Sequence, residues 1–146
     1  MTPDHGRSIM TQQASVFEDR RRRRSEEPST AIALQLEQVV DDFDLDCCII
    51  VDADGESVAS SPQATSPQME AFAGLLPAIC TVTGQREDYL RQLRRAGWDV
   101  DADELTGCVF RAGGRRMFIG AIGAEAVMNE VAIFRAITGA RRIHGS

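Results

Sequence analysis

The residues best suited to acid–base chemistry are scarce in this chain and poorly placed for it. The two histidines, His5 and His144, lie near the two ends, where we expect the chain to be mobile. General acid–base catalysis needs a side chain held in a fixed geometry, which a mobile end does not supply. The chain has no lysine, so it cannot contain a Walker-type phosphate-binding loop. We therefore expect no catalytic residues and no enzyme activity.

The cysteines offer the next possible chemistry, because thiolates bind metals and form redox pairs. No two of them have the two-residue spacing of a zinc or thioredoxin-like motif. Cys47 and Cys48 are adjacent in a strand-like run, so they should point to opposite faces and cannot bind one ion together. All four have apolar neighbours, where a free thiol behaves as a small hydrophobic side chain. We expect buried, reduced thiols and no cofactor at Cys47, Cys48, Cys80 and Cys108.

A cluster of acidic residues at 99–104 raises the question of calcium binding. An EF-hand loop that began at Asp99 would need glycine at its sixth position and glutamate at its twelfth. The chain has Glu104 and Phe110 at those positions. The pattern therefore predicts a solvated acidic loop and no metal site.

Residues 1–28 have the composition of a disordered tail, with few large apolar residues and Pro28 at the end. The run Arg20, Arg21, Arg22, Arg23 and Arg24 leaves open an alternative role as an anchor for anionic lipid or nucleic acid. Acidic neighbours on both sides of the run weaken that alternative. Residues 31–146 carry ten arginines against seventeen acidic residues, which makes nucleic acid an unlikely partner for this part of the chain.

The pattern of apolar residues predicts the helices and strands that would position any functional side chain. A helix should begin after Pro28, with its apolar stripe from Ile32 to Phe43. An apolar strand at 47–51, a turn at Asp52–Gly55 and a weaker strand at 56–60 should follow. We place the folded domain at 29–142. No run is long enough to span a bilayer and no secretory signal is visible, so we expect a cytoplasmic protein.

The second half predicts three more helices and a hairpin. A helix should run from Ser66 to Thr83 with a kink at Pro77, and a shorter one should occupy 86–96. Strands at 105–111 and 116–122 are joined through Gly113-Gly114, a hairpin signal. The last helix, 124–138, is apolar nearly all round, and we expect residues 141–144 to fray. A helix apolar on every side needs cover beyond its own core face, which marks a candidate partner surface.

The order of elements resembles the Roadblock/LC7 family. The resemblance rests on Cys48–Gly55 running into Glu56–Ser60, and on Met117–Gly123 running into the final helix. It implies an α+β fold in which helices sandwich a central antiparallel sheet, with the helix at 86–96 as an addition to the family pattern.

The resemblance also implies a non-catalytic scaffold that forms dimers and regulates or anchors small Ras-like GTPases or larger protein complexes. Its dimer contact would be the outer side of the 67–83 helix and the strand starting near Leu105. Together with the apolar last helix, this gives a candidate interface of Met69, Phe72, Leu76, Leu105, Val127, Met128, Val131, Ile133 and Phe134.

Two other functions remain open at this point. One is a ligand-sensing domain of similar architecture, which would need polar groups that converge on a cavity. The residues expected to face inward are nearly all apolar. The other is an adaptor tethered to a membrane or to nucleic acid by Arg20–Arg24.

Overall fold

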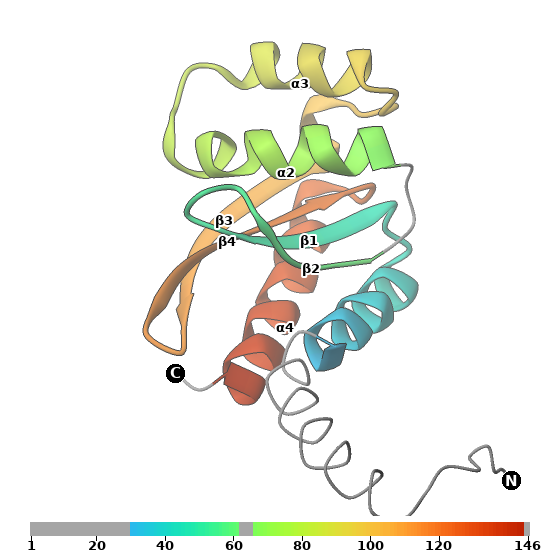
Figure 1. Ribbon diagram of the computed structural model, residues 1–146. Helices are drawn as coiled ribbons and strands as arrows, with labels where there is room; N and C mark the ends of the chain where they lie inside the picture. Colours follow the sequence, from blue (N-terminus) through green and yellow to red (C-terminus); the bar gives the residue numbers. More distant parts are fainter. Residues whose placement is uncertain (1–29, 62–65, 145–146) are drawn as a thin grey trace, which may run out of the picture.

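The computed structural model describes residues 30–61 and 66–144 and shows an α+β fold (Figure 1). Its centre is a four-stranded antiparallel sheet with the strand order β2-β1-β4-β3. Helices cover both faces of the sheet, so the predicted sandwich is confirmed for the described residues. The strands are β1 (Cys47–Asp52), β2 (Ser57–Ser60), β3 (Leu105–Ala112) and β4 (Arg115–Ile122).

The two hairpin turns form where their sequences predict them. In the β1–β2 turn, the carboxylate of Asp52 accepts hydrogen bonds from the backbone N–H groups of Asp54 and Glu56, each at 3.0 Å. In the β3–β4 turn, Gly113 and Gly114 both have positive φ, 60° and 76°. Two consecutive positive φ angles define the turn type that matches the twist of a tight hairpin, and glycine adopts them without strain.

The helices form two layers on opposite faces of the sheet. A helix over described residues 30–43 and α4 (Ala126–His144) cover one face. The other face is covered by α2 (Ser66–Thr81), and α3 (Arg86–Arg95) lies on the outside of α2 (Figure 1). Residues 1–28, the predicted tail, lie outside the described part of the chain.

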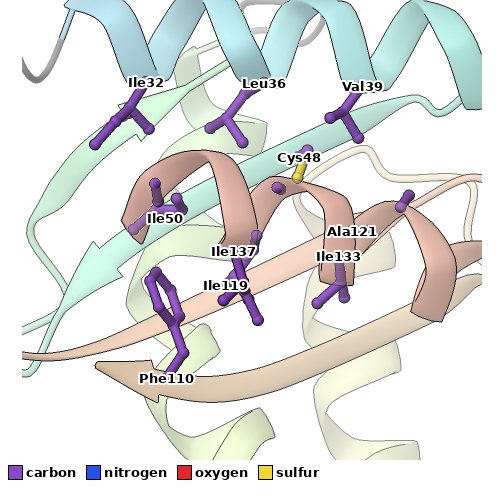
Figure 2. Packing of buried hydrophobic residues seen from close by; sticks show 14 of the residues in the cluster. Ile32, Leu36, Val39, Cys48, Ile50, Phe110, Ile119, Ala121, Ile133 and Ile137 are labelled. Carbon is purple, nitrogen blue, oxygen red and sulfur yellow. The ribbon is translucent and has the colours of Figure 1, made fainter. Parts of the chain in front are cut away.

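The sheet divides the core into two hydrophobic clusters. In the first, Ile32, Leu36 and Val39 of the 30–43 helix point toward the sheet (Figure 2). The second lies under α2 and contains Phe72 and Leu76. Cys48 belongs to the first cluster and Cys47 to the second, as their adjacent positions in a strand predict. Both faces of β1 are buried, which explains why its sequence is continuously apolar.

The C-terminal end of α4 differs from the prediction. Residues 141–144 do not fray, because α4 continues to His144. The side chain of Arg141 donates a hydrogen bond to the backbone carbonyl of Arg111 in β3, at 3.0 Å. Ile143 packs partly buried against the first cluster. These contacts with the β3–β4 hairpin hold the last turn of the helix in place.

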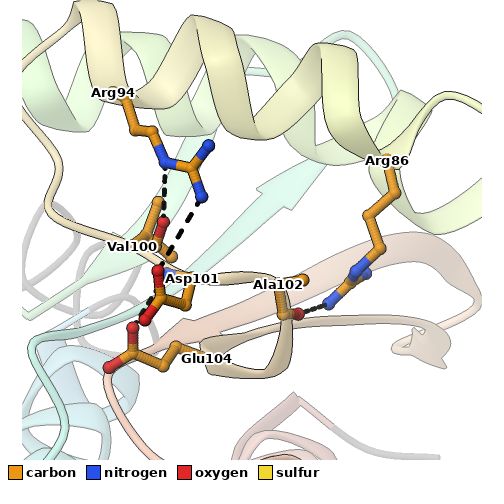
Figure 3. A network of polar contacts seen from close by, with 6 residues as sticks. All are labelled: Arg86, Arg94, Val100, Asp101, Ala102 and Glu104. Carbon is orange, nitrogen blue, oxygen red and sulfur yellow. Dashed lines mark hydrogen bonds and ion pairs between the residues drawn. The ribbon is translucent and has the colours of Figure 1, made fainter.

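The acidic segment before β3 is ordered around a short 3-10 helix, Ala102–Glu104. The Glu104 carboxylate accepts the backbone N–H of Asp101 at 2.8 Å, and the Asp101 side chain accepts the backbone N–H of Glu104, so the two residues form a capping box (Figure 3). Arg94 of α3 lies 3.9 Å from the Asp101 carboxylate. The side chains of Asp101 and Glu104 thus have a structural role, because they cap this short helix.

Two glycines let α2 pack closely on the sheet. Gly107 and Gly120 are cross-strand partners in β3 and β4. A Cβ atom on Gly120 would lie 2.6 Å from Cζ of Phe72 and 2.7 Å from Cδ1 of Leu76. A Cβ on Gly107 would lie 2.9 Å from the sulfur of Cys80. Contacts this short require the helix or its side chains to move.

We therefore expect Gly120→Ala to lower the free energy of unfolding by about 1–3 kcal/mol, because the added methyl group overpacks the core. The control is Gly74→Ala in α2, where a Cβ meets nothing within 4 Å. That change should raise stability by about 0.5–1 kcal/mol, since alanine is the better helix former. Urea unfolding of both variants checks the pair. Equal changes in the free energy of unfolding for the two variants would contradict the close packing of α2 on Gly120.

Candidate interaction surface

The outer side of α2 is covered by α3 and the residues that follow it. The indole N–H of Trp98 donates a hydrogen bond to the backbone carbonyl of Gln68 at 2.8 Å. The Trp98 ring also meets the ring of Phe72 edge to face, with 6.0 Å between centroids. Leu90 and Leu93 of α3 are buried in the same cluster. The side of α2 that the family resemblance assigned to a dimer contact is therefore occupied by this chain itself.

The free edge of β3 is also partly blocked. Arg86 of α3 donates hydrogen bonds to the backbone carbonyls of Ala102 and Leu105, at the start of the strand (Figure 3 draws the first of these). Arg141 of α4 binds the carbonyl of Arg111 near the other end. Side chains that occupy edge carbonyls prevent another strand from pairing there. The carbonyls near both ends of the strand that begins at Leu105 are thus already bound by side chains of this chain.

Several residues of the predicted interface are part of the core instead. Phe72, Leu76, Leu105 and Ile133 are buried, with at most 4% of the side chain exposed. Met69 is partly buried, and its sulfur lies 3.6 Å from the Cys47 thiol. These five positions present little surface to a partner in the isolated chain, and their place in the candidate interface stays a prediction. Their apolar character is evident from the sequence, but the sequence does not show that other parts of the chain cover them.

The remaining four predicted residues lie together on the exposed side of α4. Val127 and Phe134 are 70% and 71% exposed, and Met128 and Val131 are 45% and 48% exposed. Val127, Val131 and Phe134 are spaced i, i+4, i+7, so they form one row along two turns of the helix. We call Val127, Met128, Val131 and Phe134 the α4 face. An exposed row of large apolar side chains is typical of a protein contact surface.

Two contacts of α4 fix the direction of the α4 face, one from its buried side and one from the edge of the exposed side. Asn129 is fully buried and donates hydrogen bonds to the Glu104 carbonyl at 3.1 Å and the Thr106 hydroxyl at 3.3 Å. Arg135 lies 2.5 Å from the carboxylate of Asp42 in the 30–43 helix. A hydrogen bond from Gln38, followed by the contact with Arg135, holds the pKa of the Asp42 carboxyl below its usual range. A rotation of α4 that buried its exposed row would break all of these contacts.

Leu34 and Val82 are the other large hydrophobic side chains exposed in residues 30–61 and 66–144, at 61% and 48%. Sequence reasoning did not select either. Leu34 lies on the outer side of the 30–43 helix and Val82 follows the end of α2. Leu34 breaks the polar pattern of its helix face, and this signal is visible in the sequence. Neither residue belongs to a row.

Three of the thiols, those of Cys47, Cys48 and Cys80, are in environments that suppress their reactivity. Burial, with a smaller contribution from the nearby Asp46 carboxylate, raises the pKa of the Cys47 thiol to about 12. Burial likewise raises the pKa of Cys80 to about 12 and raises that of Cys48 strongly. Since the thiolate is the nucleophile, these cysteines are poor candidates for catalysis. Within the described residues, no three cysteine, histidine or acidic side chains are grouped so as to hold a metal ion.

A groove lies between the β1–β2 hairpin and α2 and has a volume of about 380 Å³. Its polar side chains include Glu56 and Glu70, and its floor includes Ile49 and Met69. The ligand-sensing alternative requires polar groups around a cavity, and this groove has two carboxylate side chains in its lining. Both glutamates are exposed, and the groove opens to solvent.

The Arg20–Arg24 run lies outside the described residues. No helix in the described residues is long and apolar enough to cross a membrane. No protein-family model matches this chain, and no curated protein matches its sequence. The assignment of a function therefore rests on the surfaces of the molecule and on the family resemblance of its sequence.

Proposed function

We propose that this chain is a non-catalytic protein-interaction module that binds through the α4 face. The observation that carries the proposal is the exposure of Val127 and Phe134, each about seven-tenths exposed at the two ends of one apolar row. The large apolar residues of α2 and α3 are covered by their neighbours. Exposing such side chains costs solvation free energy unless a partner covers them.

A second copy of the chain is the partner that the α4 face fits best. In a twofold dimer the same patch meets itself, so an apolar patch is automatically complementary to its counterpart. Two α4 helices packed along this row would bury Val127, Val131 and Phe134 of each protomer between them, as in other helix pairs. This dimer would use a different surface from the α2 and β3 contact implied by the family resemblance.

The resemblance to Roadblock/LC7 domains supports a small Ras-like GTPase as the partner of this dimer. The described fold is compatible with this resemblance, since the chain has an antiparallel sheet between helices, as the family resemblance implies. The high pKa values of the Cys47 and Cys80 thiols support a binding role without catalysis. On this proposal the dimer acts as a scaffold that regulates or anchors the GTPase.

Nucleotide-dependent capture tests the GTPase part of the proposal. The tagged full-length chain is incubated with lysate of its source cell that contains either GDP or a non-hydrolysable GTP analogue. We expect a small GTPase to be enriched in one nucleotide state by about tenfold or more, which corresponds to a typical coupling free energy between two sites. Capture of no GTPase, or equal capture in both states, would remove the GTPase from the account and leave self-association.

A further inference from the structure

One end of the molecule collects half of the arginines of the described part of the chain. Residues 30–144 contain ten arginines, and five of them lie on the β3–β4 hairpin and the last turns of α4. All five are exposed. We call these residues the basic end: Arg111, Arg115, Arg116, Arg141 and Arg142.

The fold brings these arginines together from distant parts of the sequence. The C-terminal end of α4 lies against the β3–β4 turn (Figure 1). The Arg141 side chain binds the carbonyl of Arg111, and a Cβ atom on Gly113 would lie 3.2 Å from the carbonyl oxygen of His144. The hairpin turn and the helix end are therefore in contact. Arg115 lies on the face of the hairpin that α4 covers, and Arg111 and Arg116 lie on the other face.

The basic end is poorly neutralised within the described part of the chain. Arg111 and Arg116 are directly opposite each other on β3 and β4, so their side chains share one face of the hairpin. Like charges in this position repel. Arg116 lies over the ring of Phe118 at 5.2 Å, and Arg111 reaches the carbonyl of Gly114 at 3.3 Å. These contacts position the guanidinium groups without cancelling their charge.

Only one acidic side chain contacts the basic end in the described residues. The Asp52 carboxylate lies 3.9 Å from Arg115, and it already accepts two backbone N–H groups in its own turn. The arginines of α3 differ, since Arg91 lies 2.6 Å from Asp88 and Arg94 lies near Asp101. An uncompensated group of guanidinium groups is suited to bind carboxylates, because each guanidinium can donate two parallel hydrogen bonds to one carboxylate.

We propose that the basic end binds a short acidic peptide segment of a partner protein. Arginine clusters commonly recognise acidic motifs in this way. The whole chain has a net charge of −6, so a long polyanion such as nucleic acid, or a charged membrane, meets repulsion from the rest of the surface. A short peptide is affected mainly by charges within about 8 Å, the screening length at physiological salt. The local charge of the basic end therefore favours a small acidic partner segment.

Fluorescence anisotropy with a labelled ten-residue glutamate peptide tests this inference on the full-length chain. We expect binding at low salt that weakens as salt is added. The double variant Arg111→Gln/Arg116→Gln should bind at least about tenfold more weakly, because two charge-assisted contacts are lost. The matched control, Arg91→Gln/Arg95→Gln on α3, removes the same charge elsewhere and should change affinity by less than about twofold.

Three results would overturn the inference. They are no binding of the peptide by the wild-type chain, equal loss in the two double variants, and tighter binding of phosphatidylserine vesicles or single-stranded RNA than of the peptide. The Phe134→Asp variant should still bind the peptide, since Phe134 is not part of the basic end. A failure here is therefore distinguishable from a failure of the α4 proposal.

Discussion

Trp98→Ala is expected to lower the free energy of unfolding by about 3–5 kcal/mol, the usual range for the loss of a buried tryptophan ring. Trp98 is 5% exposed, packs against Phe72 and donates its indole N–H to the backbone carbonyl of Gln68. Its removal creates a cavity between α2 and the segment that follows α3. The variant should also expose part of the outer side of α2, because the Trp98 ring no longer covers it.

A second substitution separates the ring from its hydrogen bond. Trp98→Phe keeps an aromatic ring against Phe72 and loses the donor to Gln68, so it should cost less, about 1–2 kcal/mol. Urea unfolding gives the free energies, and binding of a hydrophobic dye reports the exposed surface. A Trp98→Ala variant as stable as the wild type would show that α3 does not depend on this residue to cover α2.

The fold was largely predictable because its signals are local. The Gly113-Gly114 pair fixes a tight turn, and the apolar run at 47–51 has the length and composition of a buried strand. The helical spacing from Ile32 to Phe43 marks the face that enters the first cluster. Helix ends were less predictable. Contacts of Arg141 and Ile143 with distant residues decide where α4 ends, and such contacts leave no mark in the neighbouring sequence.

The candidate interface was predictable only in part, since an apolar pattern does not reveal what covers each face. Phe72 and Val127 are both apolar residues on predicted helices, yet one is fully buried and the other is 70% exposed. The sequence predicted the short helix at 86–96 but not that it would cover α2. On α4, where apolar residues occur nearly all round, periodicity could not separate Ile133 from Phe134. The packing of Asn129 and Arg135 makes that distinction.

Phe134→Asp should have the largest effect on association. Phe134 is 71% exposed in the isolated chain and lies at the end of the row formed with Val127 and Val131. In a twofold dimer the change occurs in both protomers and places a carboxylate in each apolar contact. We expect a loss of about 3 kcal/mol or more, which weakens the dimer at least about 100-fold. Thermal stability of the monomer should change little, because the residue makes few contacts within its own chain.

Val82→Asp is the matched control. Val82 is an exposed apolar residue that is not part of the α4 face, and it is 48% exposed. The same charge at this position should leave association unchanged, because no partner surface is assigned there. If both variants weakened association equally, net charge would be the cause and the α4 face would have no special role.

Sedimentation velocity of the full-length chain tests the central claim most directly. Samples of the wild type, Phe134→Asp and Val82→Asp are compared over a series of concentrations up to tens of micromolar. The account predicts a dimer for the wild type and Val82→Asp, and a monomer for Phe134→Asp. A wild-type chain that is monomeric throughout, or a Phe134→Asp variant that remains dimeric, would contradict self-association through the α4 face.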